Sequence, residues 1–322
     1  MNVYRELADV PPISSGRAVT IGAFDGVHLG HQAVLRLVRD LARVRGLTAT
    51  VLTFDKHPAE VVRPESAPCR LTTLEQKLEL IAATGMVDEC VVLTFDEARS
   101  KETAEQFVAE VLASTLRTRL VVVGSDFHFG FRRHGDVPLL QRMGAELGFE
   151  ALGLGLVASA DGASAADGTL PFSSTRVRSL LAAGAVAEAA MILGRPHEAR
   201  GPVERGDARG RDLGFPTANV AVAAGTCLPA DGVYAGRFIA ADGAARPAAL
   251  SLGRRPTFYA DAGMRLLEAY VLDFDGDLYN QPVRVEFHHH LRGQERFASV
   301  DDLIAQMERD VAETRRCMAE GG

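Results

Sequence analysis

The chain has 322 residues, of which 47% are hydrophobic and 24% are charged, and its formal net charge is −7. These values are typical of a globular protein with enough apolar material for two domains, and the negative charge argues against a general affinity for nucleic acid or for an anionic membrane. The four cysteines form no C-x-x-C pair and no apolar run reaches about 18 residues, so we expect a cytoplasmic protein with neither a zinc site nor a membrane span.

The first half of the chain alternates short apolar runs with helical patterns. The runs predict strands at 17–24, 48–54, 89–95 and 119–127, and the patterns predict helices at 31–46, 72–85, 104–116 and 138–148. This alternation predicts a parallel sheet wrapped by helices, a fold that binds ligands where the strand order reverses. The small and polar residues at 158–174 predict a loop within the same domain.

The second half of the chain has a different rhythm. Two short helices are expected on either side of Gly184, and the second should end at Gly194. A hairpin is then expected to turn at Asp242-Gly243, followed by strands at 266–274 and 281–291 and by a terminal helix behind a Ser299 cap. This half is therefore predicted to be β-rich with a terminal helix.

Two histidines stand three residues apart in the stretch GAFDGVHLGH, at 22–31, between a predicted strand and a predicted helix. His28 and His31 should lie near the helix N-terminus, where unpaired N–H groups attract anions, and on nearly the same helix face. Gly22 and Gly26 would allow the backbone to approach a phosphate. An isolated pair is usually a helix start with two surface histidines, but this strand-to-helix context is the one that a site for ATP phosphates requires.

The same stretch resembles the H-x-G-H signature of nucleotidyltransferases, in the form that is typical of the bacterial bifunctional riboflavin kinase/FAD synthetase family. Four further stretches resemble motifs of that family in the same order: TFDKHP at 53–58, VGSDFHFGFRRHGD at 123–136, SSTRVR at 173–178 and GDARGRDLGFPTANV at 206–220. The resemblance implies a Rossmann-like nucleotidyltransferase domain over residues 1–188, with a parallel sheet and helices. It also implies a riboflavin kinase β-barrel with a terminal helix over residues 189–322.

The resemblance implies two reactions. In the second domain ATP would phosphorylate riboflavin to FMN, and in the first domain FMN would attack the α-phosphorus of ATP to give FAD and pyrophosphate. ATP would be the co-substrate of both reactions and Mg²⁺ the metal. No nucleic acid or membrane partner is implied, and we expect a monomer or a weak homo-oligomer.

In the first domain the resemblance makes His28 and His31 ligands of the ATP phosphates. Arg178 offers a planar fork to the β- and γ-phosphates, and the hydroxyls of Ser174 and Thr175 cap a helix or donate to phosphate. Phe127 would pack on the flavin ring, although core packing is the usual role of such an aromatic side chain. The other residues implied at the nucleotide or flavin site are Gly22, Phe24, Asp25, Gly26, His57 and Asp126.

In the second domain a glycine-rich segment with Gly206, Gly210 and Gly214 would let backbone N–H groups face phosphates. Thr217 and Asn219 are two residues apart in an extended segment, so they would point the same way toward one Mg²⁺.

Glu268 interrupts an apolar strand in this domain. By resemblance it is the base that takes the proton from the ribityl 5′-hydroxyl, and a salt-bridged strand residue is the alternative. Pro216 and Arg292 are implied at the flavin or nucleotide pockets. The three histidines at 288–290 should alternate faces of a strand and so not converge on one metal ion.

A few residues depart from the family pattern, and they leave other functions open. Lys56, Phe131, Phe172 and Arg255 replace the residues that are usual there, so a paralogue with one active half or a changed flavin preference stays possible. A different nucleotidyltransferase would leave residues 200–322 unexplained. A flavin-binding protein without turnover would have little use for a base at Glu268.

Overall fold

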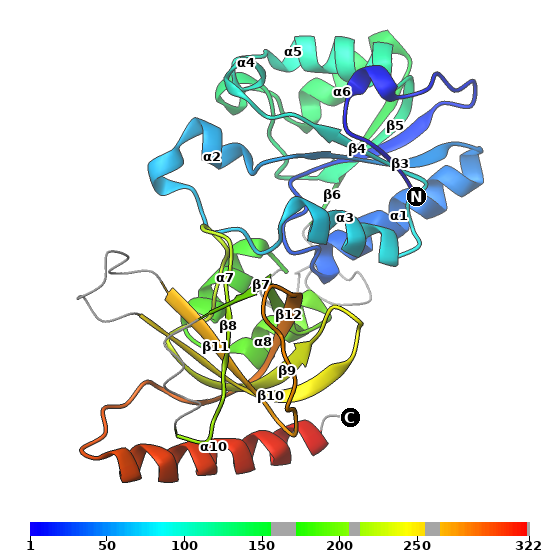
Figure 1. Ribbon diagram of the computed structural model, residues 1–322. Coiled ribbons are helices and arrows are strands. Elements are labelled where there is room, and N and C mark those ends of the chain that lie inside the picture. The colour runs from blue at the N-terminus through cyan, green and yellow to red at the C-terminus, as the bar shows by residue number, and fades with distance from the viewer. Residues whose placement is uncertain (156–171, 206–212, 255–264, 321–322) are drawn as a thin grey trace. The chain divides into compact units, whose positions relative to one another are not determined.

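The computed structural model describes residues 1–155, 172–205, 213–254 and 265–320 (Figure 1). Contacts group the chain into two compact units, Met1–Ser174 and Thr175–Gly322. The sequence predicts a later boundary, between residues 188 and 189, and that boundary stays a prediction. Most of the expected loop at 158–174, Gly206, Gly210 and Arg255 lie outside the described residues.

The first unit is built on a six-stranded parallel sheet, as the sequence predicts. Its order is β1-β4-β3-β2-β5-β6. The strands are β1 (Asn2–Tyr4), β2 (Arg17–Ile21), β3 (Thr48–Phe54), β4 (Glu89–Leu93), β5 (Thr118–Gly124) and β6 (Glu150–Leu154). The predictions did not include β1, which has only three residues, or β6, which contains no β-branched residue.

Helices connect these strands. They are α1 (Leu29–Arg45), α2 (Pro58–Val62), α3 (Leu74–Ala83), α4 (Glu97–Ser100), α5 (Ala104–Gln106), a π-helix η3 (Phe107–Thr115) and α6 (Val137–Leu147), with short 3₁₀ turns η1 (Leu7–Asp9), η2 (Pro64–Ser66) and η4 (Phe131–Arg133). As predicted, α1 ends at Gly46, whose φ of 64° is the left-handed conformation that glycine adopts without strain.

The sheet is buried on both faces, because alternate strand residues pack against different helices. On β2, Val19 and Ile21 belong to one core cluster together with Leu112 of η3 and Leu140 of α6. On the opposite face Ala18 packs with residues of α1, and Val51 of β3 packs with residues of α3. Burial on both faces is typical of parallel sheets and explains why the strands read as continuous apolar runs.

The strand order reverses at β2. From β2 the chain continues to β3 and β4 on one side, and it then returns to β5 and β6 on the other side. In such sheets ligands bind in the crevice at the carboxyl ends of the two strands that flank this reversal, which here are β2 and β5.

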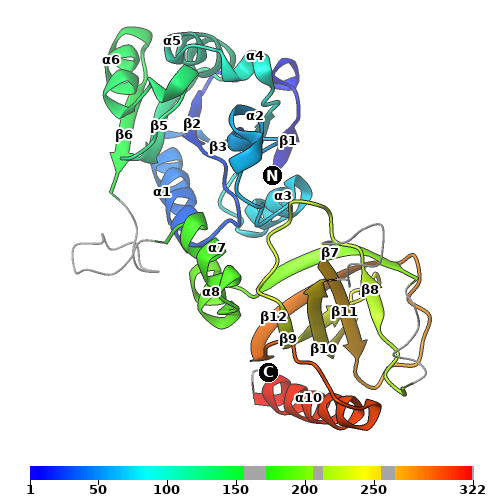
Figure 2. The ribbon, with the colours of Figure 1, turned by 90° about the vertical axis from the view of Figure 1, so that its left-hand side faces the viewer.

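The second unit is a closed antiparallel barrel with the order β10-β11-β8-β7-β12-β9 (Figure 2). Its strands are β7 (His197–Glu204), β8 (Ala218–Val220), β9 (Gly232–Ile239), β10 (Ala245–Arg254), β11 (Arg265–Val271) and β12 (Pro282–Arg292). The hairpin β9–β10 turns at Gly243, which has a φ of 85°, as the sequence predicts. A closed barrel leaves no free strand edge to pair with another chain.

Three helices accompany the barrel: α7 (Ser174–Ala182), α8 (Val186–Leu193) and α10 (Val300–Glu320). Gly184 and Gly194 end the first two in left-handed conformations, and the Ser299 hydroxyl accepts from the Asp302 amide at the start of α10. All three helices are therefore confirmed. No helix in the described part of the chain is both long and apolar enough to cross a membrane.

Candidate active sites

The motif segments of the first unit lie at one edge of its sheet. GAFDGVH follows β2, DKH follows β3 and SDFHF follows β5. Because the carboxyl ends of parallel strands share an edge, and because the strand order reverses between β2 and β5, these segments border the crevice expected for a ligand.

The histidine pair stands at the start of α1, where the sequence predicts it. His28 is the N-cap residue, and its Nδ1 accepts a hydrogen bond of 3.3 Å from the His31 amide. The two rings are stacked with their centroids 3.6 Å apart. Because Nδ1 of His28 accepts this bond, the other ring nitrogen, Nε2, carries an N–H group.

His31 is held in its neutral form. Burial, followed by the proximity of His28 and Lys77, keeps the pKa of His31 well below its ordinary value. Its Nδ1 atom is buried without a hydrogen-bond partner among the described residues. A buried nitrogen in this condition costs free energy unless a ligand or water contacts it, so the atom marks a place where a polar ligand would be stabilising.

The turn between β2 and α1 adopts an unusual backbone conformation. Phe24, Gly26 and Val27 have φ values of 50°, 83° and 41°. Phe24 and Val27 are also buried in the core, so they are fixed there although such conformations cost about 1–3 kcal/mol each. Strain of this kind is common at ligand-binding turns, and it fixes the backbone just before His28.

Asp25 holds this turn in place. Its carboxylate accepts hydrogen bonds from the amides of Leu71 and Thr72 at 3.0 Å each and from the Thr72 hydroxyl at 3.1 Å, and that hydroxyl accepts from the Gly26 amide. Gly22 continues the sheet, since its amide donates to Leu52. The structure thus gives Asp25 a structural task that the sequence did not reveal, because its partners are some 46 residues away.

His57 repeats the arrangement of His28 at the end of β3. It caps α2, its Nδ1 accepts from the Ala59 amide at 3.2 Å, and its own amide donates to Glu60. Because Nδ1 accepts this bond, the other ring nitrogen, Nε2, carries an N–H group. Lys56, which departs from the family pattern, is exposed and leaves these bonds intact.

The segment after β5 combines exposed and half-buried side chains. Asp126 is exposed, whereas the rings of Phe127 and Phe129 stack with centroids 5.4 Å apart and pack against the core. Core packing thus accounts for part of their surface, and a flavin contact of Phe127 stays a prediction. Phe131 is exposed and lies under the guanidinium of Arg132.

Ser174, the last residue of the first unit, contacts the turn that precedes the histidine pair. The Ser174 hydroxyl donates to the Asp25 carbonyl at 2.8 Å, although the two residues are 149 positions apart. Thr175 and Arg178 follow on α7 as members of the second unit, and their role as phosphate ligands stays a prediction.

In the second unit, strand pairing brings the predicted base next to a predicted metal ligand. Glu268 on β11 is directly opposite Asn219 on β8, so both side chains lie on the same face of the barrel wall. Both are half-buried, between neighbours on each strand that are buried. Thr217 is two residues before Asn219 and also half-buried. The alternation of burial explains how a carboxylate stands in an otherwise apolar strand.

The residues just before β8 fix the position of the segment that leads into this strand. Gly214 has a φ of 85°, and the ring of Phe215 meets Tyr270 of β11 edge-on with centroids 5.3 Å apart. Pro216 is exposed. The contact between Phe215 and Tyr270 holds the segment that carries Thr217 against the strand that carries Glu268.

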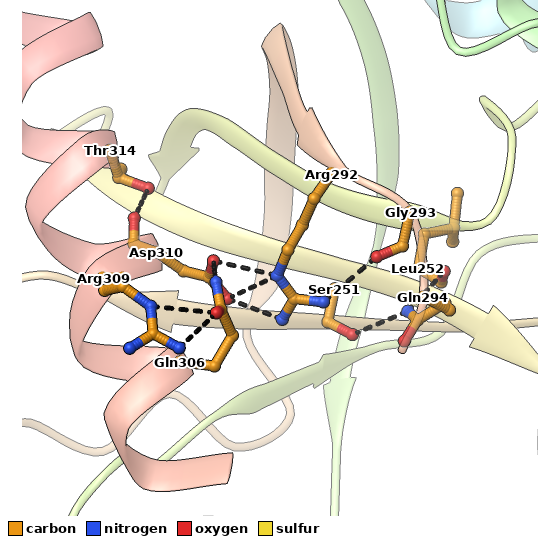
Figure 3. Close-up of polar contacts among 9 residues, drawn as sticks. All are labelled: Ser251, Leu252, Arg292, Gly293, Gln294, Gln306, Arg309, Asp310 and Thr314. Atoms are coloured by element: carbon orange, nitrogen blue, oxygen red, sulfur yellow. Dashed lines mark hydrogen bonds and ion pairs between the residues drawn. The ribbon is translucent and has the colours of Figure 1, made fainter. Parts of the chain in front are cut away.

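Arg292, at the end of β12, is bound to the terminal helix (Figure 3). Its Nε donates to Oδ1 of Asp310 at 3.0 Å and its Nη2 donates to Oδ2 at 2.7 Å, while Gln306 donates to the same carboxylate at 2.8 Å. The remaining nitrogen of Arg292 donates to the Gly293 carbonyl. The guanidinium is thus anchored to α10, and its contact with flavin stays a prediction.

No cluster of three or more histidine, cysteine, aspartate or glutamate side chains in the described ranges is arranged to hold a metal ion. In the row of three histidines, His288 faces Glu286 at 3.2 Å and His290 packs on the ring of Tyr234. Neutral oxygen atoms from Thr217 and Asn219 together with phosphate oxygens are a donor set that suits Mg²⁺.

Sequence reasoning missed three polar residues that hold these sites together: Thr72, Lys77 and Asp310. The only local signal was Lys77, a charged residue on the apolar face that Leu74, Leu78 and Ile81 form in the helix predicted at 72–85.

Two family models match the chain. The first, described as FAD synthetase, matches residues 10–163, and the second, described as riboflavin kinase, matches residues 193–318. A solved structure described as a macrolide-efflux protein from Streptococcus pneumoniae is similar over 97% of this chain and 98% of its own, with a TM-score of 0.82 and 29% sequence identity.

Curated relatives match across both units. A bifunctional riboflavin kinase/FMN adenylyltransferase from Escherichia coli K12 is 39% identical over 296 residues, which cover 92% of this chain and 90% of the relative. A protein of the same name from Pseudomonas fluorescens is 38% identical over 319 residues, which cover 99% and 98%. The chain therefore belongs to the family of bifunctional riboflavin kinases/FMN adenylyltransferases.

Proposed function

We propose that each unit of the chain carries one of the two reactions of its family. The chain phosphorylates riboflavin to FMN with ATP, and it transfers the adenylyl group of ATP to FMN to give FAD and pyrophosphate. We assign the adenylyl transfer to the edge of the parallel sheet in the first unit and the phosphorylation to the face of the barrel that carries Glu268.

The observation that supports the first assignment is the position of the histidine pair at the strand-order reversal. His28 is the N-cap residue of α1, and the N-terminus of this 17-residue helix carries a partial positive charge that attracts phosphate. A positive charge fixed in this way would stabilise the charge that moves onto the departing pyrophosphate. The terminal phosphate of FMN attacks the α-phosphorus directly, so no covalent enzyme intermediate is needed.

The pairing of Glu268 with Asn219 supports the second assignment. We assign to the Glu268 carboxylate the removal of the proton from the 5′-hydroxyl of riboflavin as that oxygen attacks the γ-phosphorus of ATP. Thr217 and Asn219 would hold Mg²⁺, which offsets phosphate charge when it is bound. The cytoplasmic location and the monomeric or weakly oligomeric state expected from the sequence stay predictions.

The test is to incubate the purified full-length chain with Mg²⁺, ATP and either riboflavin or FMN, and to separate the flavin products. We expect His28→Ala to abolish FAD formation from FMN while riboflavin phosphorylation survives, and Glu268→Gln to have the opposite effect. FAD formation at the wild-type rate by the His28 variant would remove the first assignment. Normal phosphorylation by the Glu268 variant would remove the second, and bound flavin without turnover by the wild type would contradict both.

A further inference from the structure

Lys77 is a buried lysine beneath the adenylyl-transfer site. It lies on the apolar face of α3, between Gln76 and Leu78, and the whole residue is only 7% exposed. A buried ammonium group costs several kcal/mol unless partners or a function compensate for its lost hydration. The contacts of Lys77 should therefore show what compensates for its burial in the apolar stripe of a helix.

The contacts of Lys77 join two strand ends. Its Nζ donates to the carbonyl of Ala23, two residues after the end of β2, at 3.1 Å, and to the carbonyl of Phe54, the last residue of β3, at 2.7 Å. The Thr53 hydroxyl also donates to the Ala23 carbonyl, at 3.3 Å. Lys77 thus fixes the two points from which the chain turns toward His28 and toward His57.

Acidic side chains surround Lys77. Burial lowers the pKa of Lys77, and the carboxylates of Asp25, Asp55 and Glu60 oppose this by favouring its charged form. The Lys77 charge in turn is one of the causes that lower the pKa of His31. The lysine and the histidine pair are therefore electrostatically coupled.

We propose that Lys77 is a positioning residue for adenylyl transfer, which ties the turn that carries the histidine pair to the turn after β3 and keeps a positive charge behind the phosphate site. This inference rests on the assignment of His28 and His31 to the phosphates of ATP. The ammonium donates to two main-chain carbonyls, so its proposed action is through the geometry and protonation of the histidines. Displacements of about 1 Å in a catalytic group can cost about a hundredfold in rate.

The experiment compares Lys77→Met, which keeps the length of the side chain but removes the charge and both hydrogen bonds, with Ile81→Ala as a matched control. Ile81 is fully buried one turn further along α3, so its truncation destabilises the same helix without touching the two carbonyls. Riboflavin phosphorylation by the same full-length protein serves as the internal reference. The measurements are kcat and KM for FMN adenylylation. The pKa of His31 is measured by NMR titration of protein with labelled histidine.

We expect Lys77→Met to lower kcat for adenylylation by tenfold or more, to leave phosphorylation within twofold, and to raise the pKa of His31, whereas Ile81→Ala changes neither kcat nor that pKa. Wild-type kcat in Lys77→Met, or an unchanged His31 titration, would overturn the proposal. So would equal losses of kcat in the two variants, since the effect would then follow stability. If both His28→Ala and Lys77→Met kept full adenylylation activity, the assignment of the site itself would be wrong. If only Lys77→Met kept full activity, the proposed role of Lys77 would be wrong.

Discussion

The position of His31 depends on the local sequence, whereas its protonation also depends on residues that are distant in the chain. Its place in the first turn of α1 follows from the local sequence, but its protonation follows from burial and from the neighbouring charges of His28 and Lys77. The buried Nδ1 atom of His31 lacks a hydrogen-bond partner in the described part of the chain, and a bound phosphate would contact a polar atom there. The approach of a phosphate would favour the protonated form, so binding of ATP should raise the pKa of His31.

The depressed pKa of His31 predicts a loss of stability in acid. Below its ordinary pKa of 6.5 the unfolded chain binds a proton that the folded chain does not, so the free energy of unfolding of the first unit should fall as the pH drops from about 6.5 toward the folded-state pKa. Urea titrations at pH 7.5 and 5.5, followed by circular dichroism, measure this fall. We expect a smaller fall in His31→Gln, and an equal fall in variant and wild type would contradict the prediction.

At the scale of elements, the terminal helix α10 is joined to the barrel by more than apolar contacts. Cys317 and Met318 pack on Ala235 of β9, and Asp310 binds Arg292 at the end of β12. The periodicity of the sequence predicts the helix and its apolar stripe. It does not identify the partner of Asp310, because that partner belongs to a different element.

The pair of Arg292 and Asp310 predicts a stability effect. The two side chains are only 16% and 9% exposed, so Asp310→Asn should leave a largely buried guanidinium uncompensated and destabilise the second unit by about 3 kcal/mol. The double variant Arg292→Met, Asp310→Leu should cost clearly less, because neither charge remains buried alone. Denaturant titration of the three proteins measures both effects. Equal losses in the single and double variants would contradict the prediction, because the loss would then not come from a guanidinium left without its partner.

At the scale of the whole molecule, the chain has two units with separate sheets and separate candidate sites. Residues 10–163 and 193–318 match two different family models, and each range contains its own predicted base or phosphate ligands. FMN is the product of one reaction and the substrate of the other. Because the histidine pair and Glu268 lie in different units, we expect either reaction to proceed when the other site is inactive.

A complementation experiment tests this independence. Glu268→Gln alone and His28→Ala alone should each fail to make FAD from riboflavin and ATP, while a mixture of the two proteins should make it, because FMN released by one diffuses to the other. Flavin separation over time measures the product. If the mixture accumulates FMN without FAD, the intermediate must pass within one chain, and the proposed independence is wrong.

The sequence by itself determined the local features of this protein: the alternation of strands and helices, the helix ends at Gly46, Gly184 and Gly194, and the histidines at a strand-to-helix junction. Each depends on residues a few positions apart, where periodicity and backbone preference act directly. Only the tertiary structure decided that Asp25 holds the turn through Thr72, that Lys77 joins Ala23 to Phe54, and that Glu268 is opposite Asn219. These contacts join distant parts of the chain, and strand order and register bring them together.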